Sequence, residues 1–425
     1  MKWNGWLLVL MGLVLAGCGT GETSLETNDV APTVRLQMVD EPVHVLGQLA
    51  REPMVVEHPS GTLFLSGFGS QIHGVDPNQP PYLWRSADGG SSWTPVDVGT
   101  AEDGARGNSD VDLAVGPSGE LYFAVMGFDR STFEGTHIVV GVSHDVGESW
   151  VWTPLSEDRG DDRPWVVVAP DGTAHVVWND GQGVNHARST DGGLSWIEGA
   201  EVSDMGGSSH LAVGPQGELA VRITPLSASG RQFDEGFEKV AVSVDQGNTW
   251  VLHDFPGQIE WDPTFQNTGA IPRWVEPLAW DADGALYLLW SEGTNVELAR
   301  SEDRGASWTM REIANDQMSA FFPYLVARGS GELAATWFTG DGDSLYVNLA
   351  LIRDDTTADA SQEIVRADGF EPQTWMDTVE TKARDTAGEY VPVIFLADGD
   401  LGVVTPVQDA HNDRYGFTWW RFRVE

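Results

Sequence analysis

The sequence predicts an all-β fold made of repeated four-stranded antiparallel sheets, and three observations support this prediction. A short motif, S-x-D-x-G-x-[S/T]-W, occurs five times along the chain, and a strand–turn–strand pattern occurs seven times. The segments between these copies show no helical periodicity. A spacing of roughly fifty residues between copies is typical of an array of supersecondary units.

The first 17 residues have the features of an export signal. Lys2 precedes the apolar run WLLVLMGLVLAG, which is too short and too close to the terminus for a stable membrane span. The stretch from Leu15 to Cys18, LAGC, resembles the lipobox of bacterial lipoproteins, and Cys18 is the only cysteine. The resemblance implies cleavage before Cys18, acylation of that residue and a polar tether over residues 18–31. An ordinary secretory peptide with an incidental cysteine is the alternative. Gly19, in place of Asp, resembles lipoproteins that are exported onward to an outer membrane or cell surface.

Each repeat unit contains four expected strands. Two apolar runs flank a tight turn in which P-x-G or D-x-G supplies a glycine with positive φ. A third run leads into the motif, and a fourth begins after its tryptophan. The turn glycines are Gly61, Gly119, Gly172, Gly217, Gly284, Gly331 and Gly399. The motifs are WRSADGGSSW (Trp84 to Trp93), VSHDVGESW (Val142 to Trp150), RSTDGGLSW (Arg188 to Trp196), VSVDQGNTW (Val242 to Trp250) and RSEDRGASW (Arg300 to Trp308).

Four antiparallel strands per unit, repeated without helices, are the pattern of a β-propeller. The seven turn glycines favour seven blades; six is the alternative, if one unit is a decorated insertion. The last unit ends in YGFTWWRFRVE and lacks an outer strand. The segment from Thr33 to Val39 can supply that strand and close the ring by pairing the two ends of the chain. We therefore expect one propeller domain over residues 32–425.

The array resembles the Asp-box (BNR) repeat proteins, whose best-known members are the sialidases, over nearly the whole chain after the tether. In such a hairpin the carboxylate accepts backbone N–H groups, and the tryptophan packs between neighbouring blades. The motif aspartates are therefore expected to be structural: Asp88, Asp145, Asp191, Asp245 and Asp303. Function is expected at the other end of the blades, where the innermost strands begin.

Polar residues stand immediately before the expected inner strands. A mixture of acids, guanidinium groups and a phenol around a concave mouth would suit a polar anionic ligand, although strand entries are also polar because they are exposed. These residues are Arg51, Glu52, Asp110, Asp112, Asp162, Arg163, His210, Arg273, Glu276 and Tyr324.

The sialidase resemblance implies roles for some of them. The segment Arg51 to Leu63 resembles the R-x-P stretch at the first inner strand of sialidases, so Arg51 would bind a sugar carboxylate. Asp76, in the loop before the first motif, would be the acid/base, with a D-P turn as its structural alternative. Tyr324 would be the nucleophile and Glu276 its partner.

Three further arginines are candidates for the remaining carboxylate-binding positions: Arg163, Arg222 and Arg273. None of them lies in a motif that assigns it. Arg163 is one residue closer to its proline than Arg51 is, so strand alternation predicts that its side chain points to the other face.

Composition limits the function classes. The net charge of -40 argues against nucleic-acid binding, because phosphates would be repelled, and it disfavours an anionic substrate. A single cysteine excludes a disulfide framework, and no phosphate loop, metal-ligand spacing or cofactor motif is present. We expect no cofactor, no metal, and membrane contact through the lipid anchor only. Two functions stay open: a surface-anchored module that binds a glycan or protein at the funnel, slightly favoured, and a sialidase-like exo-glycosidase that hydrolyses terminal acidic sugars.

Overall fold

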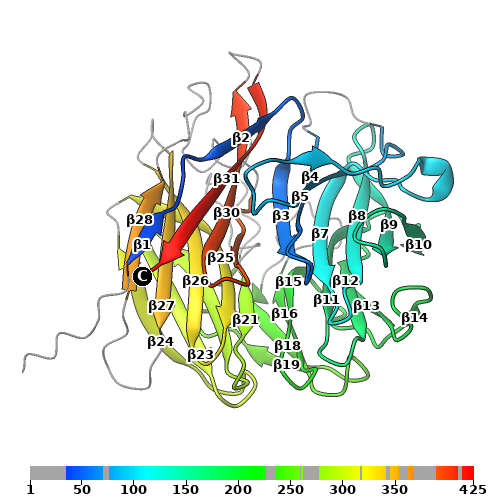
Figure 1. Ribbon diagram of the computed structural model, residues 1–425. Helices are drawn as coiled ribbons and strands as arrows, with labels where there is room; N and C mark the ends of the chain where they lie inside the picture. The colour runs from blue at the N-terminus through cyan, green and yellow to red at the C-terminus, as the bar shows by residue number, and fades with distance from the viewer. Residues whose placement is uncertain are drawn as a thin grey trace, which may run out of the picture. The chain divides into compact units, whose positions relative to one another are not determined.

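The computed structural model describes residues 35–69, 76–225, 236–258, 260–261, 277–315, 318–340, 345–353, 362–367, 389–409 and 414–425. Within these residues the chain forms seven antiparallel sheets of a β-propeller and one two-stranded sheet (Figure 1). The seven-bladed all-β fold predicted from the sequence is therefore confirmed. The described segments contain no helix that is long and apolar enough to span a membrane.

Each blade uses four consecutive strands, except where the two ends of the chain meet. Blade 1 consists of β3 (Arg51–Glu57), β4 (Leu63–Phe68), β5 (Tyr82–Ser86) and β6 (Thr94–Pro95). Blade 2 consists of β7 (Ser109–Val115), β8 (Leu121–Asp129), β9 (Glu134–Ser143) and β10 (Val151–Ser156). A short 3-10 helix, η2 (Ala101–Asp103), connects these two blades. Blade 3 consists of β11 (Asp162–Val168), β12 (Ala174–Asn179), β13 (Val184–Ser189) and β14 (Ile197–Glu198).

Blade 4 consists of β15 (Gly207–Val213), β16 (Leu219–Thr224), β18 (Lys239–Ser243) and β19 (Val251–Asp254). The separate two-stranded sheet is formed by β17 (Gly236–Phe237) and β20 (Glu260–Trp261). Blade 5 consists of β21 (Leu278–Trp280), β22 (Leu286–Glu292), β23 (Asn295–Ser301) and β24 (Thr309–Asn315). Blade 6 consists of β25 (Ser319–Arg328), β26 (Glu332–Gly340), β27 (Leu345–Arg353) and β28 (Gln362–Ala367).

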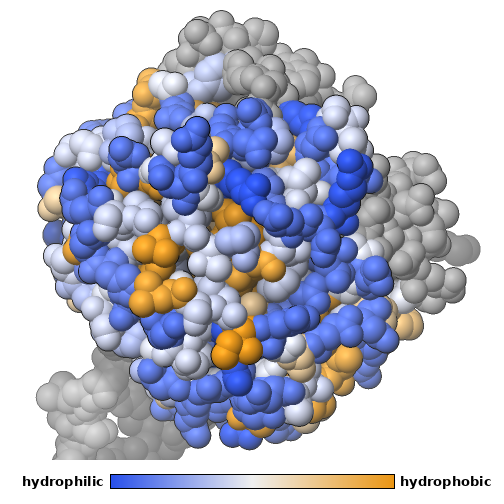
Figure 2. All heavy atoms as spheres, turned by 90° about the vertical axis from the view of Figure 1, so that its right-hand side faces the viewer, coloured by the Kyte–Doolittle hydropathy of each residue, from blue (hydrophilic) through white to orange (hydrophobic). Residues whose placement is uncertain are grey.

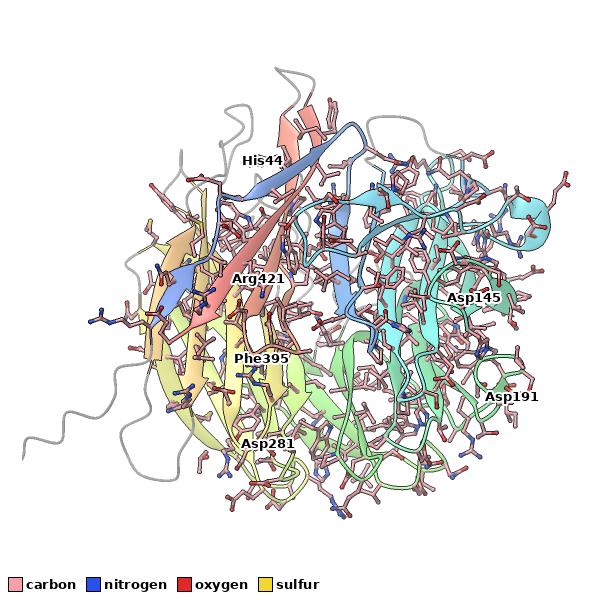
Figure 3. All side chains as sticks on the ribbon, in the orientation of Figure 1. His44, Asp145, Asp191, Asp281, Phe395 and Arg421 are labelled. Atoms are coloured by element: carbon pink, nitrogen blue, oxygen red, sulfur yellow. The ribbon has the colours of Figure 1, made fainter. Side chains whose placement is uncertain are left out.

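Blade 7 joins the two ends of the chain. It contains β29 (Val393–Phe395), β30 (Leu401–Asp409) and β31 (Arg414–Val424), and β1 (Leu36–Met38) and β2 (Val43–Leu46) both pair with β31. The predicted N-terminal closing strand is thus present, and a second one follows it. A side-chain bond of 2.9 Å between His44 Nδ1 and Thr418 Oγ1 adds to the backbone pairing of β2 (Figure 3). The pairing of β1 and β2 with β31 thus closes the ring between the two ends of the chain.

The apolar core lies between neighbouring blades. The second strand of a blade has paired strands on both edges and a neighbouring sheet against each face, so both sets of its side chains are buried. In β8, residues Leu121 to Val125 are all 0% exposed, and every residue of β4, β12 and β16 is buried. Hydrophilic residues cover most of the outer face in Figure 2, with small separate hydrophobic areas.

The five motif hairpins share one hydrogen-bond pattern. In the first, Ser86 Oγ donates to Asp88 Oδ1 at 2.8 Å and accepts the Gly90 N–H at 2.8 Å. Asp88 also accepts the N–H and hydroxyl of Ser92, at 2.9 and 2.6 Å. The serine is buried while the aspartate is exposed. The role expected of the aspartate, which is to satisfy a buried backbone donor, therefore belongs to the serine, and the aspartate orients the serine hydroxyl from the solvent side.

The motif glycine lies against the preceding blade. A Cβ atom at Gly90 would lie 1.9 Å from the indole of Trp419, and one at Gly193 would lie 2.8 Å from the ring of Tyr122. Both glycines also have positive φ, at 95° and 82°. Only glycine satisfies both requirements, because any side chain would force the two blades apart.

Three motif tryptophans pack on the preceding blade, in agreement with the expectation that they pack between neighbouring blades. Trp93 lies 5.6 Å from Trp419, and Trp196 lies 6.4 Å from Tyr122. Trp250 lies 5.6 Å from the ring of His186. Trp150 differs, because its ring is 6.2 Å from Phe123 of its own blade.

A buried histidine pair lies where blade 3 meets blade 4. His175 Nδ1 and His186 Nε2 are 3.0 Å apart, and the two residues are 0% and 1% exposed. Gly247 of the blade 4 hairpin packs on His186. Burial, followed by the nearby Arg188, lowers the pKa of His175 to about 4. Burial, His175 and Arg188 together lower the pKa of His186 to about 3. Both rings are therefore neutral at pH 7.

Ser86→Ala is expected to lower the free energy of unfolding by about 1–3 kcal/mol, because the buried Gly90 N–H loses its acceptor. Asp88→Ala should have a smaller effect, since water can reach the donors that it leaves. Ser91→Ala, in the same hairpin but exposed, is the control and should change stability by less than about 0.5 kcal/mol. Denaturant unfolding of the three variants measures these differences, and a larger loss for Asp88→Ala than for Ser86→Ala would contradict the assignment.

Acid should weaken the junction of blades 3 and 4. The folded-state pKa values of His175 and His186 lie below the usual value of about 6.5, so the unfolded chain takes up protons first and stability falls as the pH drops below about 6.5. The melting temperature of the wild type should therefore fall more between pH 7.5 and pH 5 than that of His186→Gln. His253→Gln, which changes a partly exposed histidine, should behave as the wild type; equal losses in all three proteins would refute this explanation.

Candidate functional site

The first strand of each blade is its inner strand, next to the central channel of the propeller. Five of the inner strands begin with β-bulges at the same end of this channel. Register shifts occur in β3, β7, β11, β15 and β25, within the first residues of each strand. In four of these strands a residue other than glycine has positive φ: Glu52 at 47°, Arg163 at 52°, His210 at 55° and Phe322 at 51°. Such a conformation costs about 1–3 kcal/mol at each position, and bulges re-aim side chains. We call this end of the channel the inner-strand mouth.

Charged side chains from four blades meet at the inner-strand mouth. Arg163 Nη2 lies 3.4 Å from Glu389 Oε2, which joins blade 3 to the segment before blade 7 on the far side of the ring. Arg163 Nε is also 3.7 Å from Asp162 Oδ2, and Arg51 Nε is 3.4 Å from Glu52 Oε1. We define the charged cluster as these residues and their electrostatic neighbours: Arg51, Glu52, Asp110, Arg130, Asp162, Arg163 and Glu389.

Burial, with neighbouring carboxyl groups adding to it, raises the pKa values of two carboxyl groups of the charged cluster. Burial, Asp110 and Glu389 raise the pKa of Glu52 well above its usual range, against the opposing effect of Arg51. Burial raises the pKa of Asp162 to about 7; Arg163 opposes this, while Asp110 and Glu389 add to it. Glu52 and Asp162 therefore retain protons near neutral pH, because burial disfavours their charged forms and neighbouring carboxyl groups add to this effect.

Aromatic rings form the adjoining part of the mouth. The ring of His210 stacks on Trp165 with 4.4 Å between centroids, and it lies edge-on to Tyr324 at 5.1 Å and Tyr390 at 5.9 Å. His210 is 7% exposed, and neither of its ring nitrogens has a hydrogen-bond partner in the described part of the chain. Burial, Arg222 and Arg163 lower its pKa to about 3, so the imidazole is neutral.

The structure brings some of the predicted residues together. Arg51, Arg163 and Tyr324 all lie at the inner-strand mouth. The expectation that Arg163 points away from Arg51 stays a prediction, because a β-bulge begins both β3 and β11 and Arg163 has the position that Glu52 has in β3. Burial, with Asp112 adding to it, raises the pKa of Tyr324, whose hydroxyl lies 3.7 Å from Met54 Sδ.

Arg222 lies near His210, whose pKa burial and this arginine lower, but inside blade 4, and Asp76 lies in a connection between strands. Arg222 is 0% exposed, donates to Glu238 at 2.5 Å and lies 4.8 Å from the ring of Phe255. Asp76 is exposed in the connection between β4 and β5, and its Oδ1 accepts the Asn78 N–H at 2.9 Å. Arg273 and Glu276 fall outside the described residues. The catalytic roles of Asp76, Tyr324 and Glu276 therefore stay predictions.

Sequence reasoning missed three members of the site, Arg130, Glu389 and Tyr390. Glu389 and Tyr390 shortly precede Val393, where β29, the inner strand of blade 7, begins, so the rule that identified the other polar strand entries could have found them. Arg130 follows β8 and is an electrostatic neighbour of Arg51. Burial raises the pKa of Tyr390 well above its usual value; Arg163 opposes this, whereas Glu52, Asp110 and Glu389 increase it.

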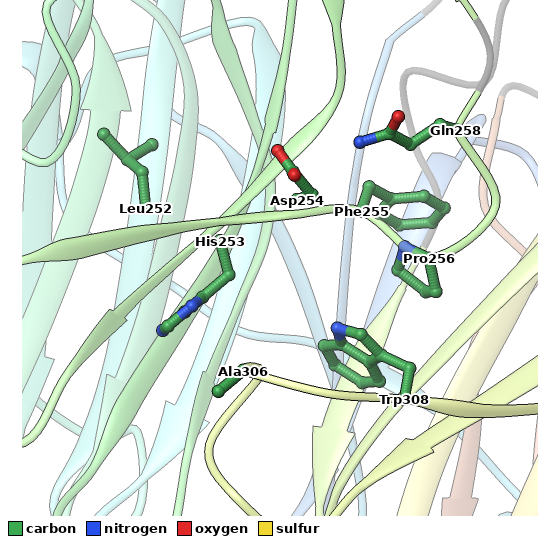
Figure 4. Close-up of a pocket in the computed structure, with 8 residues that line it drawn as sticks. All are labelled: Leu252, His253, Asp254, Phe255, Pro256, Gln258, Ala306 and Trp308. Carbon is green, nitrogen blue, oxygen red and sulfur yellow. The ribbon is translucent and has the colours of Figure 1, made fainter.

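Three cavities lie away from the charged cluster. Figure 4 shows one of about 690 Å³, where the end of β19 faces the blade 5 hairpin across Phe255 and Trp308. A cavity of about 520 Å³ has the corresponding place between β10 and the blade 3 hairpin. Because they recur between different blades, we attribute both to the splay of neighbouring sheets. The third, of about 380 Å³, is lined by the far ends of five inner strands, from Val115 to Ala327, at the opposite mouth.

The described residues contain no group of three or more His, Cys, Asp or Glu side chains that could hold a metal ion. The carboxyl groups of the charged cluster are instead interleaved with guanidinium groups. Such an arrangement can accept and donate hydrogen bonds at one place, which suits a ligand with several polar groups.

No family model matches this chain. Among curated proteins, photosystem II stability/assembly factor HCF136 of Arabidopsis thaliana is 25% identical over 214 residues, which are 49% of this chain and 46% of that protein. The chain thus spans about half the length of the curated relative that it matches.

Several solved structures share the fold. An inactive virginiamycin B lyase from Staphylococcus aureus, solved with quinupristin, has a TM-score of 0.51 and 12% identity, covering 91% of this chain and 99% of its own. YCF48 from Cyanidioschyzon merolae has a TM-score of 0.50 and 12% identity, covering 92% and 99%. A Hadza microbial sialidase has a TM-score of 0.49 and 16% identity, covering 69% and 65%. These proteins are structural neighbours, and the similarity to the lyase and to YCF48 agrees with the β-propeller fold.

Proposed function

We propose that this protein is a binding module of the Asp-box type that takes a glycan at the inner-strand mouth and does not cleave it. The charged cluster is the observation that carries the proposal. It is held by strained bulges and is joined across the ring by the Arg163–Glu389 ion pair. Strain of this kind is retained where a surface needs a fixed geometry.

The chemistry of the mouth suits a saccharide. Sugar hydroxyls both donate and accept hydrogen bonds, and the mouth offers carboxyl acceptors, guanidinium donors and the imidazole of His210 within one partly buried region. The Asp-box assignment is supported by the repeated Ser, Asp and Gly hydrogen bonds of the five hairpins.

A sialidase-like hydrolase of terminal acidic sugars is the second candidate, because Arg51, Arg163 and Tyr324 share the mouth and the pKa of Asp162, about 7, suits a general acid. Two observations weigh against it. Arg222 is engaged by Glu238 inside blade 4, and the pKa of Tyr324 is raised, whereas a nucleophile must lose its proton.

Incubation of the full-length protein with a glycan array and with a fluorogenic sialoside separates these functions. We expect glycan binding without turnover, and Glu389→Gln should weaken that binding. Arg85→Ala, which removes an exposed ion pair with Glu148 at the opposite end of the blades, should leave binding unchanged. Turnover that is lost in Arg51→Ala and Asp76→Ala would establish the hydrolase instead. If no glycan binds and a protein partner is captured, the glycan assignment fails.

We also propose that the protein is an exported lipoprotein, anchored through Cys18 to an outer membrane or cell surface. The proposal rests on the LAGC stretch, which lies outside the described residues. Labelling with an alkynyl fatty acid should tag the wild type and not Cys18→Ser. Thr20→Ala should be tagged normally, and Gly19→Asp should retain the protein at the inner membrane. Equal labelling of Cys18→Ser and the wild type would refute the anchor.

A further inference from the structure

The guanidinium group of Arg130 has no partner at the inner-strand mouth. Arg130 follows β8 in blade 2 and is half-buried. Among the described residues this side chain makes no ion pair, and its Nε is buried without a hydrogen-bond acceptor. An N–H group that is buried without an acceptor is costly, above all on a charged side chain, so we take Arg130 as a sign of a ligand that accepts hydrogen bonds.

A second guanidinium group lies beside Arg130. Burial, and then the charge of Arg51, lower the pKa of Arg130, so the two like charges are close to each other in a chain whose net charge is -40. Glu52 contacts Arg51 but retains its proton near neutral pH, so this contact leaves the positive charge in place. We call Arg51 and Arg130 the arginine pair. Its charge is best balanced by an anion.

The turn after β8 fixes the backbone at Arg130. Asp129 Oδ1 accepts the N–H and the hydroxyl of Ser131, at 2.8 and 2.7 Å. The ring of Phe133 lies edge-on to Phe128 with 5.1 Å between centroids, and Phe133 has a positive φ of 59°. Such a conformation persists only where the surrounding structure enforces it. Arg130 is therefore presented from an ordered turn, which lowers the entropic cost of binding.

The neutral imidazole of His210 is an independent sign of a ligand. His210 has the same bulge position in β15 as Glu52 has in β3, at the same mouth. The residue is 7% exposed, and neither ring nitrogen has a hydrogen-bond partner within the described part of the chain. A neutral imidazole offers one donor and one acceptor, which a sugar hydroxyl can satisfy. The unpaired groups of the mouth together suit a sugar with an anionic substituent.

We propose that the inner-strand mouth selects a sulfated saccharide, whose sulfate ester binds the arginine pair while a sugar hydroxyl bonds the imidazole of His210. This inference rests on the proposed glycan binding and specifies its ligand. The terminal oxygens of a sulfate ester only accept hydrogen bonds, and guanidinium groups match such oxygens in charge and geometry. The single negative charge of the ester equals the positive charge of Arg130.

The behaviour of Glu52 favours a sulfate over a carboxylate. Glu52 contacts Arg51 and nevertheless retains its proton, because burial and the neighbouring Asp110 outweigh the arginine. The carboxylate of a ligand would meet the same conditions and would lose its charge by taking up a proton. A sulfate ester is the anion of a strong acid and keeps its charge. A phosphate ester would bring up to two negative charges close to the same carboxyl groups, which is less favourable.

The acidic surface affects the approach of this ligand more than its binding. A net charge of -40 slows the diffusion of an anion towards the protein. At physiological salt, however, exposed charges are screened beyond about 8 Å. The partly buried arginine pair is therefore what the bound sulfate experiences most strongly.

The test compares oligosaccharides with and without sulfate. A glycan array would carry tetrasaccharides of chondroitin sulfate and of carrageenan among other sulfated glycans, each beside its desulfated form. Desulfated chondroitin keeps its carboxylates, so this pair separates sulfate from carboxylate. Calorimetry of the full-length protein, at neutral pH and about 150 mM salt, then measures the pair that binds best. One lost charge-assisted hydrogen bond corresponds to a factor of about ten, so we expect the sulfated form to bind at least about tenfold more tightly.

Variants then locate the binding. Arg130→Gln should weaken binding of the sulfated form by about tenfold and leave that of the desulfated form unchanged. Arg159→Gln is the matched control, because it removes the same charge from an exposed arginine that Glu134 engages at 3.2 Å, and it should change neither. His210→Phe keeps the aromatic packing and should weaken both forms alike. Arg130 has no partner to lose, so Arg130→Gln should melt at the temperature of the wild type or above it.

The outcomes separate the inference from the proposed function. Equal binding of the sulfated and desulfated forms, lost in His210→Phe, would overturn the sulfate assignment and leave glycan binding at the mouth intact. A preference for sulfate that persists in Arg130→Gln would overturn the arginine pair as its site. Sialyllactose that binds as tightly as the sulfated form would overturn the selection against carboxylates. Binding of no glycan on the array would overturn the proposed function itself.

Discussion

The propeller depends on the close approach of neighbouring blades at the motif hairpins. In four of the five hairpins the motif glycine leaves room for a ring of the preceding blade; at Gly305 the nearest ring atom, of His253, would lie 3.4 Å from an added Cβ. The glycine N–H is buried at that contact, so it needs an acceptor inside the hairpin, and the motif serine supplies one. If the serine were absent, the contact would bury an unsatisfied donor. The same hairpin thus allows close packing between two sheets and satisfies the backbone N–H group that this packing buries.

This arrangement places the motif hairpins and the inner-strand mouth at opposite ends of the blades. Because strands alternate in direction, the hairpin between the third and fourth strands lies opposite the start of the first strand. The hairpins hold the blades together at one end. At the other end, four inner strands begin with left-handed residues, a conformation that survives only where the surrounding structure enforces it. Closure of blade 7 by both ends of the chain completes the ring that enforces it.

The charge of the mouth follows from its being shared by several blades. No single blade brings the whole cluster together: Arg163 and Glu389 are 226 residues apart in the chain and come within 3.4 Å only because the ring is closed. The fold is common to proteins as different as a virginiamycin B lyase and YCF48, so specificity must come from these grafted side chains.

Local patterns in the sequence determined the architecture, because each blade is specified by nearby residues: two apolar runs, a turn glycine and a motif with fixed spacing. The closing strand could also be predicted, since the last unit lacked a partner for its edge. The polar strand entries indicated the mouth, and Glu389 follows the same rule. Only the tertiary structure decided which residues form ion pairs. Examples are the pairing of Arg222 with Glu238 and that of Arg163 with Glu389. A bulge reverses the direction of a side chain, and a ring sets residues from distant blades side by side, and neither effect is encoded in the spacing of residues along a strand.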